Sequence, residues 1–140
     1  MSNVENRYRE FGGLLKFYYI ISIIGLIVGI SNFGNFSYNN RDYISNSEQN
    51  IYTLIFVILS IMLVAIIMNL KKKSRKSLNT IRVILIIQFV LNLALIVFQS
   101  INHLSLSAID IVSFFFLKTI WIVYFFASKR VDIYYFESNT

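Results

Sequence analysis

Residues 51–70 read IYTLIFVILSIMLVAIIMNL, a stretch of twenty residues without a charged side chain. A helix needs about 20 apolar residues to cross a hydrocarbon layer of about 30 Å. Three similar stretches occupy residues 13–31, 81–101 and 109–128. Inside a bilayer every backbone group must be satisfied within the segment, so these stretches are expected to be helices although many of their residues are β-branched. The sequence therefore predicts an all-α polytopic membrane protein, an antiparallel bundle of four transmembrane helices.

The composition of the whole chain agrees with a membrane location. Of 140 residues, 56% are hydrophobic and 14% are charged, whereas soluble domains carry about a quarter charged residues. The chain has no cysteine, which excludes disulfides, thiolate nucleophiles, iron–sulfur clusters and cysteine zinc sites. Its single histidine, His103, cannot form a multi-histidine metal site. We expect one membrane domain over residues 1–140, with no cofactor, no metal and no catalytic residue.

The distribution of lysine and arginine predicts the orientation of the helices. Basic residues precede the first apolar stretch and recur in the predicted loop 71–80 and in the tail 129–140. The predicted loop 32–50 has one basic residue, and residues 102–108 have none. Cytoplasmic segments of membrane proteins carry an excess of basic residues. Both termini and the loop 71–80 are therefore expected in the cytoplasm, and the loop 32–50 on the outer side.

The basic loop also predicts a lipid partner. Basic residues near an anionic membrane surface contribute about 1 kcal/mol each to attraction. The residues expected to attract anionic lipids are Lys71, Lys72, Lys73, Arg75 and Lys76. Nucleic acid is not an expected partner, because the loop lacks a folded basic domain and interleaved aromatic residues. Abundant isoleucine and asparagine are typical of an AT-rich genome, so the predicted location is the cytoplasmic membrane of a bacterium.

Lys118 is the basic residue that falls within the bilayer. It lies in the sequence SFFFLKTIWIVYFF, about 12 Å from the outer end of its predicted helix. Insertion scales give a central lysine an unfavourable free energy of about 2.5–3.5 kcal/mol, so a partner or a route to the surface is expected. Polar residues at similar depths, and on the same helix face as Asn92, complete a predicted polar layer in the outer half of the bundle. Its members are Lys118, Asn92, Ser60, Ser22, Gln88 and Gln99.

This polar layer has two interpretations. It is either a site for an anion, a lipid headgroup or a water-filled path, or a set of packing residues. In the second case Asn92 or nearby carbonyls hold Lys118, and the amides join neighbouring helices. Apart from Asp110 at the edge, no acidic residue lies at membrane depth, which disfavours proton relays and cation-coupled transport.

Two further patterns in the sequence concern helix packing and catalysis. Gly25 and Gly29 form a GxxxG pattern that allows close backbone approach, to a helix of the same bundle or to a second copy of the chain. Residue types used in catalysis occur close together around the predicted connection 102–108. They are His103, Ser105, Ser107 and Asp110. A Ser/His/Asp triad depends on geometry that a short turn does not provide, so the prediction is that the chain is not an enzyme.

The two ends of the apolar region resemble a known family. The first predicted helix begins at the sequence GGLL of residues 12–15. The last predicted helix contains WIVYF near its end, at residues 121–125, and SKRV follows at residues 128–131. These sequences are similar to the signature of small four-span bacterial membrane proteins grouped as domain of unknown function 2569. That family typically shows Gly-Gly-Trp-Leu, then Trp-Ile-Pro-Tyr-Phe and Ser-Lys-Arg-Val. Leu14 and Val123 depart from the signature.

The resemblance implies a four-helix integral membrane protein and no particular activity. The residues of the exit motif are Trp121, Tyr124, Phe125, Ser128, Lys129, Arg130 and Val131. Aromatic rings suit helix packing or the membrane interface, and basic residues end a span at the cytoplasmic headgroups. The aromatic tail after Arg130, and residues 8–11, are expected to lie on the membrane surface.

Two functions remain open at this level. The first is a non-enzymatic partner-binding protein, such as an accessory subunit or an immunity-type protein, with a membrane-protein partner or a second copy of itself. The second is a small oligomeric channel or transporter. Its polar path would follow Lys118, Gln88, Asn92 and Gln99. A lysine packed in a dry interior would favour the first function.

Overall fold

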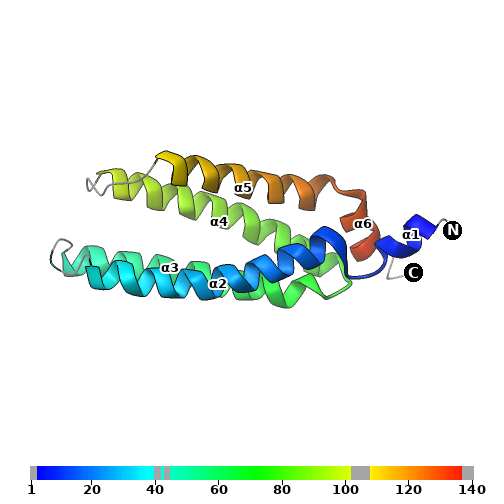
Figure 1. Ribbon diagram of the computed structural model, residues 1–140, viewed down its shortest axis with the longest axis horizontal. Coiled ribbons are helices and arrows are strands. Elements are labelled where there is room, and N and C mark those ends of the chain that lie inside the picture. Colours follow the sequence, from blue (N-terminus) through cyan, green and yellow to red (C-terminus); the bar gives the residue numbers. More distant parts are fainter. Residues whose placement is uncertain (1–2, 40–41, 43–44, 102–107, 137–140) are drawn as a thin grey trace.

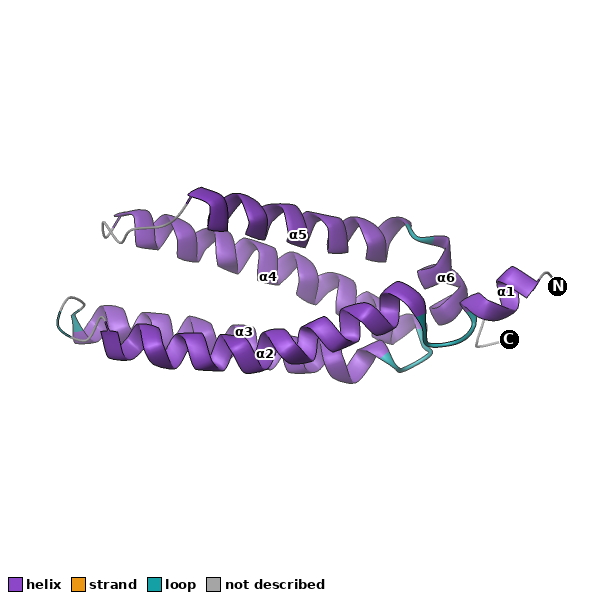
Figure 2. Ribbon diagram, viewed as in Figure 1, coloured by secondary structure: helices purple, strands orange, loops and turns teal. Residues whose placement is uncertain are grey.

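The computed structural model describes residues 3–39, 42, 45–101 and 108–136, and in these residues it contains helices and no strand (Figure 2). The helices are α1 (Asn3–Tyr8), α2 (Gly13–Asn39), α3 (Asn46–Leu70), α4 (Arg75–Ile101), α5 (Ala108–Ala127) and α6 (Lys129–Phe136). Helices α2, α3 and α4 are each long and apolar enough to cross a membrane. Helices α5 and α6, bent by 55° at their junction, pass the same test together and would make a fourth span. The chain thus has the helices of a membrane protein.

The four long helices form two hairpins that diverge. Helix α2 lies beside α3, and α4 lies beside α5 (Figure 1). The most extensive contacts join α3 to α4, while the backbones of α2 and α5 scarcely approach each other and the two helices touch through aromatic rings near α6. The hairpins meet at the end where α1 and α6 lie and separate toward the opposite end (Figure 1). The bundle is therefore closed at one end and open along the side between α2 and α5.

The closed end, called the base here, contains the main hydrophobic core. Helix α6 turns under the ends of the long helices and contributes Val131, Tyr134 and Tyr135 to this core. The remaining buried members are Leu15, Tyr18, Ile66, Leu70, Leu78, Ile81, Leu85 and Phe125. Burial of such side chains stabilises the fold by about 1.5–3 kcal/mol each in water, and dispersion gives further stability in a close-packed interior.

Side-chain hydrogen bonds complete the helix ends at the base. The last carbonyls of a helix have no partner within it. The Tyr135 hydroxyl donates to the carbonyl of Leu70 at 2.6 Å, and the Tyr134 hydroxyl donates to that of Lys71 at 3.1 Å. Arg82 Nε donates to the carbonyl of Phe125 near the end of α5, at 2.9 Å. Residues of α4 and α6 therefore cap α3 and α5.

The two ends of the chain meet at Arg130. Its guanidinium donates to the carbonyls of Arg7 and Glu10, at 3.3 and 3.4 Å. The same group lies against Gly12 and Gly13, and Gly13 has a φ of +57°, a conformation that favours glycine. The glycines of the predicted entry motif and the arginine of the exit motif are thus in contact.

The helices extend beyond several predicted boundaries. The starts near residues 13 and 109 and the ends at 70 and 101 agree with the helices found. The predicted loop 32–50 was wrong at both ends, because α2 continues to Asn39 and α3 begins at Asn46. A capping box fixes the second boundary: the Ser45 side chain accepts from the backbone of Glu48, whose side chain accepts from the backbone of Ser45.

The predicted loop 71–80 and the predicted tail also require correction. Helix α4 begins at Arg75, where the Ser74 hydroxyl accepts from the backbone N–H of Ser77. The tail was expected on the membrane surface, but Val131 and Ile133 are buried. Phe11, expected on the same surface, packs against the core. Val131, Tyr134 and Tyr135 of α6 belong to the main core, so this helix packs under the bundle.

Candidate functional site

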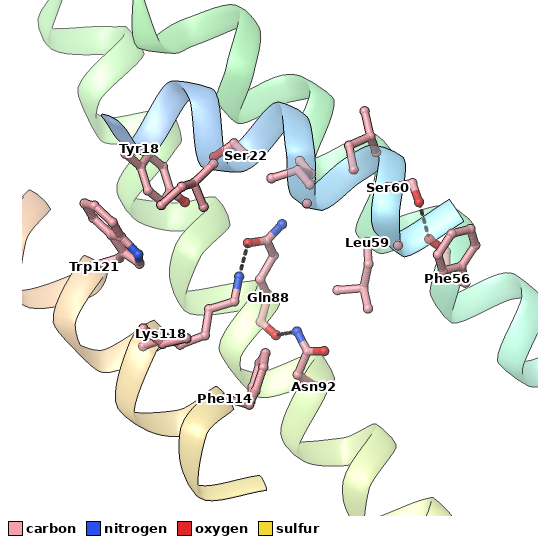
Figure 3. Close-up of a pocket in the computed structure, with 16 residues that line it drawn as sticks. Tyr18, Ser22, Phe56, Leu59, Ser60, Gln88, Asn92, Phe114, Lys118 and Trp121 are labelled. Carbon is pink, nitrogen blue, oxygen red and sulfur yellow. Dashed lines mark hydrogen bonds between the residues drawn. The ribbon is translucent and has the colours of Figure 1, made fainter. Parts of the chain in front are cut away.

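A central cavity of about 540 Å³ lies between the hairpins, next to the base (Figure 3). All four long helices line it. Its walls are formed by Tyr18, Ile21, Ser22, Gly25, Leu26, Gly29, Phe56, Leu59, Ser60, Leu63, Gln88, Asn92, Phe114, Leu117, Lys118 and Trp121. Most of these side chains are apolar, and none is acidic. Five of the six residues predicted to form a polar layer are therefore gathered around one cavity.

Lys118 projects from α5 toward α4 and is held by an amide (Figure 3). Its Nζ donates to Gln88 Oε1 at 3.2 Å and lies 5.8 Å from the centre of the Phe114 ring. Gln88 is a buried polar residue, 3% exposed. The partner of Lys118 is therefore the side-chain amide of Gln88, and not Asn92 or a backbone carbonyl as the packing interpretation supposed.

Asn92 and Ser60 bond within their own helices. Asn92 Nδ2 donates to the carbonyl of Gln88 at 2.7 Å, and Ser60 Oγ donates to that of Phe56 at 2.9 Å. Such bonds to the carbonyl four residues earlier are common for short polar side chains in helices. Neither residue joins two helices by these bonds, so the direct polar link across the cavity is that of Lys118 with Gln88.

Gln99 lies outside the central cavity. It lines a second cavity of about 240 Å³, together with Asn32, Phe33, Tyr52 and Leu95. The two cavities share three wall residues, which are Gly29, Phe56 and Leu59. They therefore adjoin, and polar side chains occur along both.

Gly25 and Gly29 face open space and are not packed against another helix of the chain. A Cβ added at either position would meet no atom within 4 Å. The close approach within the bundle that their spacing predicts is therefore absent from the described residues. Both glycines line the central cavity, and the room that their missing side chains leave is part of its volume.

Aromatic rings separate the central cavity from the base. The rings of Tyr18 and Trp121 have centroids 4.5 Å apart, and Tyr18 contacts Phe125 at 5.2 Å. Ser22, one turn further along α2, lines the cavity beside Tyr18. Sequence reasoning did not find Tyr18, although Tyr18 and Ser22 are four residues apart and therefore share a helix face.

The remaining residues of the exit motif build the base. Phe125 and Val131 are core residues, and the ring of Tyr124 packs edge-on against Phe125. Ser128 lies at the junction of α5 and α6, where its carbonyl accepts from the backbone of Asp132 at 3.2 Å. Lys129 is exposed. These residues of the motif therefore contribute packing at the base, while Trp121 of the same motif lines the central cavity.

Several basic residues of the segment expected to attract anionic lipids contact the protein itself. Lys71 Nζ lies 4.6 Å from the centre of the Tyr19 ring, and Arg75 lies 4.7 Å from that of Phe136. Lys73 Nζ donates to the carbonyl of Arg9 at 2.7 Å. All five side chains are nevertheless exposed, so their charges remain at the surface.

The described residues contain no cluster of three His, Cys, Asp or Glu that could hold a metal ion. His103, Ser105 and Ser107 lie outside the described residues, as does the side chain of Asp110. The central cavity offers N–H donors from Lys118, Gln88 and Asn92 among apolar walls. Such an arrangement can hold a group that accepts hydrogen bonds.

Comparisons with protein-family models, with curated proteins and with solved structures found no match to this chain.

Proposed function

We propose that this chain is a non-enzymatic membrane protein that binds a partner molecule within the bilayer, between its two hairpins. The observation that carries the proposal is the central cavity between α2 and α5, whose backbones scarcely approach each other and whose ring contacts lie next to the base. A bundle that served only as a packed anchor would close this side, because helix association in membranes depends on close packing. An open side with a lined cavity is expected of a protein whose packing is completed by another molecule.

The arrangement of the base favours binding over conduction. A channel through the chain would have to pass from Gln99, along Asn92 and Lys118, and then through the base. Beyond Lys118 the route meets the rings of Tyr18 and Trp121 and the buried core below them. The cavity is therefore blind toward the base. A small oligomeric channel or transporter is the alternative proposal, and it requires the base to open.

A site-specific photocrosslinker tests the binding proposal. Leu117 and Val123 both lie on α5 and are both 55% exposed, but Leu117 alone lines the cavity. With the photoreactive residue at Leu117, we expect a reproducible adduct of one molecular species, protein or lipid, identified by mass spectrometry. The matched variant at Val123 should give diffuse adducts with bulk lipid. Identical adducts at the two positions would exclude a specific partner in the cavity.

We further propose four spans with both termini and the basic segment in the bacterial cytoplasm, and membership of the family called domain of unknown function 2569. The contact of Gly13 with Arg130 supports the second point, because it gives a physical reason for the joint presence of two motifs far apart in sequence. An accessory or immunity-type role is the form of partner binding that best suits so small a protein.

The orientation can be tested directly, because the chain has no cysteine of its own. Asn50 on α3 and Lys72 in the basic segment are both exposed. In intact cells a membrane-impermeant maleimide should label Asn50→Cys, and should label Lys72→Cys only after permeabilisation. Labelling of both positions in intact cells would contradict the proposed orientation.

A further inference from the structure

The polar part of the central cavity contains one cationic side chain, Lys118, and no carboxylate among its lining residues. An ammonium group has three N–H donors. Within the described residues, that of Lys118 has one hydrogen-bond acceptor, Gln88 Oε1 at 3.2 Å. None of the residues that line the cavity is acidic. The indole nitrogen of Trp121 is turned toward the same space (Figure 3). This region therefore favours a ligand that carries hydrogen-bond acceptors and a negative charge.

The rest of the cavity is suited to hydrocarbon. From Lys118 toward the open end most wall residues are aliphatic or aromatic, and Gly25 and Gly29 leave an open strip along α2. The side chains of Ser60 and Asn92 donate to carbonyls of their own helices. At Gly29 and Phe56 the central cavity adjoins the second cavity, which leads away from the base. This shape suits a long, narrow apolar group that begins near Lys118 and runs toward the open end of the bundle.

We propose that the central cavity binds a single-chain amphiphile with an anionic head, whose carboxylate or phosphate accepts hydrogen bonds from Lys118. The inference rests on the proposed function and names its ligand class. A volume of about 540 Å³ lies within the range of about 300–1,000 Å³ for small-molecule sites. That volume suits one acyl chain better than a whole transmembrane helix. The anion also compensates the charge of Lys118, which is unfavourable in an apolar interior when unpaired.

The orientation follows from the positions of the donors. The head lies between Lys118 and Gln88, near the rings of Trp121 and Tyr18. The acyl chain of the ligand passes Gly25 and Gly29 and continues toward the second cavity. Entry is from the bilayer, between α2 and α5, because the base is closed.

The single tryptophan makes the binding measurable. Trp121 lies one helical turn from Lys118 and lines the cavity. Bromine quenches tryptophan fluorescence on near contact, so stearate brominated near its carboxylate should quench Trp121 saturably in the purified full-length chain in detergent. Stearate brominated at the far end of its chain should quench less at saturation. Equal quenching by the two would overturn the proposed orientation.

Matched variants test the binding of the anionic head and of the acyl chain separately. The positions Gly29 and Gly34 both have open space for a side chain, but Gly34 does not line the cavity. Gly29→Leu should weaken binding at least roughly tenfold, whereas Gly34→Leu should leave it unchanged. Lys118→Met should weaken binding of the acid by roughly tenfold or more, the usual loss for a hydrogen bond to a charged group. Lys16→Met, which removes an exposed charge outside the cavity, should have no effect.

Three probes that share one acyl chain but differ in their head groups test whether the unaltered protein prefers an anionic head. They are stearate, stearyl phosphate and stearyl alcohol, each brominated near the head. Tighter binding of either anion than of the alcohol, by roughly tenfold, is the expected result. The tighter of the two anions then identifies a fatty acid or a phosphate-bearing lipid as the source.

Two other outcomes count against the inference. If the alcohol binds as tightly as the anions and Lys118→Met changes nothing, but Gly29→Leu still blocks binding, the anionic head is wrong and the proposed function stands. If Gly29→Leu and Gly34→Leu both leave all three probes unaffected, the cavity is not a binding site and both proposals fail.

Discussion

The guanidinium of Arg130 occupies the space in which a side chain at Gly13 would lie. A Cβ at Gly13 would be 2.9 Å from Arg130 Nη1, and the φ of Gly13 is +57°. The contact joins the start of the first long helix to the short helix that follows the last. The rigidity of the base therefore depends on a glycine and an arginine that lie more than a hundred residues apart.

Gly13→Ala is expected to destabilise the chain. The arginine side chain can shift, but a left-handed conformation remains unfavourable for alanine by about 1–2 kcal/mol. Gly34→Ala is the matched control, because Gly34 lies within α2 with open space around it. That change should stabilise the helix by up to about 1 kcal/mol. Thermal unfolding in detergent, followed by circular dichroism, measures both, and a loss of stability in the control alone would be inconsistent with the structure.

Tyr135→Phe is expected to lower stability by about 1–3 kcal/mol. The substitution keeps the buried ring but leaves the carbonyl of Leu70 without its 2.6 Å hydrogen bond. Tyr134→Phe removes a longer bond of 3.1 Å to the carbonyl of Lys71, which is nearer to solvent, and should have a smaller effect. Denaturant unfolding monitored by Trp121 fluorescence gives both values. The opposite ranking would show that Tyr135 is not the cap of α3.

Stability should decrease at alkaline pH. Burial raises the pKa of Tyr135 above its ordinary value of 10.0, with further increases from the neighbouring Tyr134 and Tyr124. Between the unfolded and the folded pKa, the folded chain keeps a proton that the unfolded chain releases, so stability is retained below about pH 10 and lost as the pH rises beyond it. Tyr135→Phe should flatten this decline. Parallel pH profiles for the variant and the parent chain, measured by thermal unfolding, would contradict this assignment.

Arg82 and Asp132 should contribute unequally although they form an ion pair at 3.4 Å. The carboxylate is 52% exposed, and exposed pairs contribute about 0–1 kcal/mol. Arg82 also donates to the carbonyl of Phe125, a partly buried bond to a charged group that contributes about 1.5–3 kcal/mol. Arg82→Met should therefore destabilise the chain substantially, and Asp132→Asn only slightly. Equal losses in thermal unfolding would indicate that the ion pair is the main contribution.

The helical architecture could be predicted from the sequence because a long apolar stretch has few alternatives in a bilayer. The helix extensions were missed, although Ser45 and Glu48 carry a capping box that is readable from their spacing. The burial of α6 was also missed. Its residues are largely apolar or aromatic, but no local pattern states whether they meet a lipid surface or the base of the same bundle.

The polar residues of the central cavity could be predicted from their depth and, for Gln88, from the helix face that it shares with Asn92. Counting along each helix places Ser22, Ser60 and Lys118 at similar heights, and five of the six predicted residues line the cavity. The partner of Lys118 could not be chosen in this way. Gln88 and Asn92 lie on one face of α4, one turn or about 6 Å apart, which is within the error of such a count. Gly25 and Gly29 indicate from the sequence that the surface of their helix has no side chain there. The sequence does not show whether a neighbouring helix fills that space.

The position of α6 after the long helices in the sequence determines when the base of the bundle can be completed during synthesis. Chains are made from the N-terminus, so α2, α3 and α4 are complete while the carbonyls of Leu70 and Lys71 still lack their tyrosine partners. The base forms only after Tyr135 has left the ribosome and α6 has folded beneath the other helices. Until then the two hairpins are joined by the contacts of α3 with α4 and lack the packing that Val131, Tyr134 and Tyr135 add beneath them.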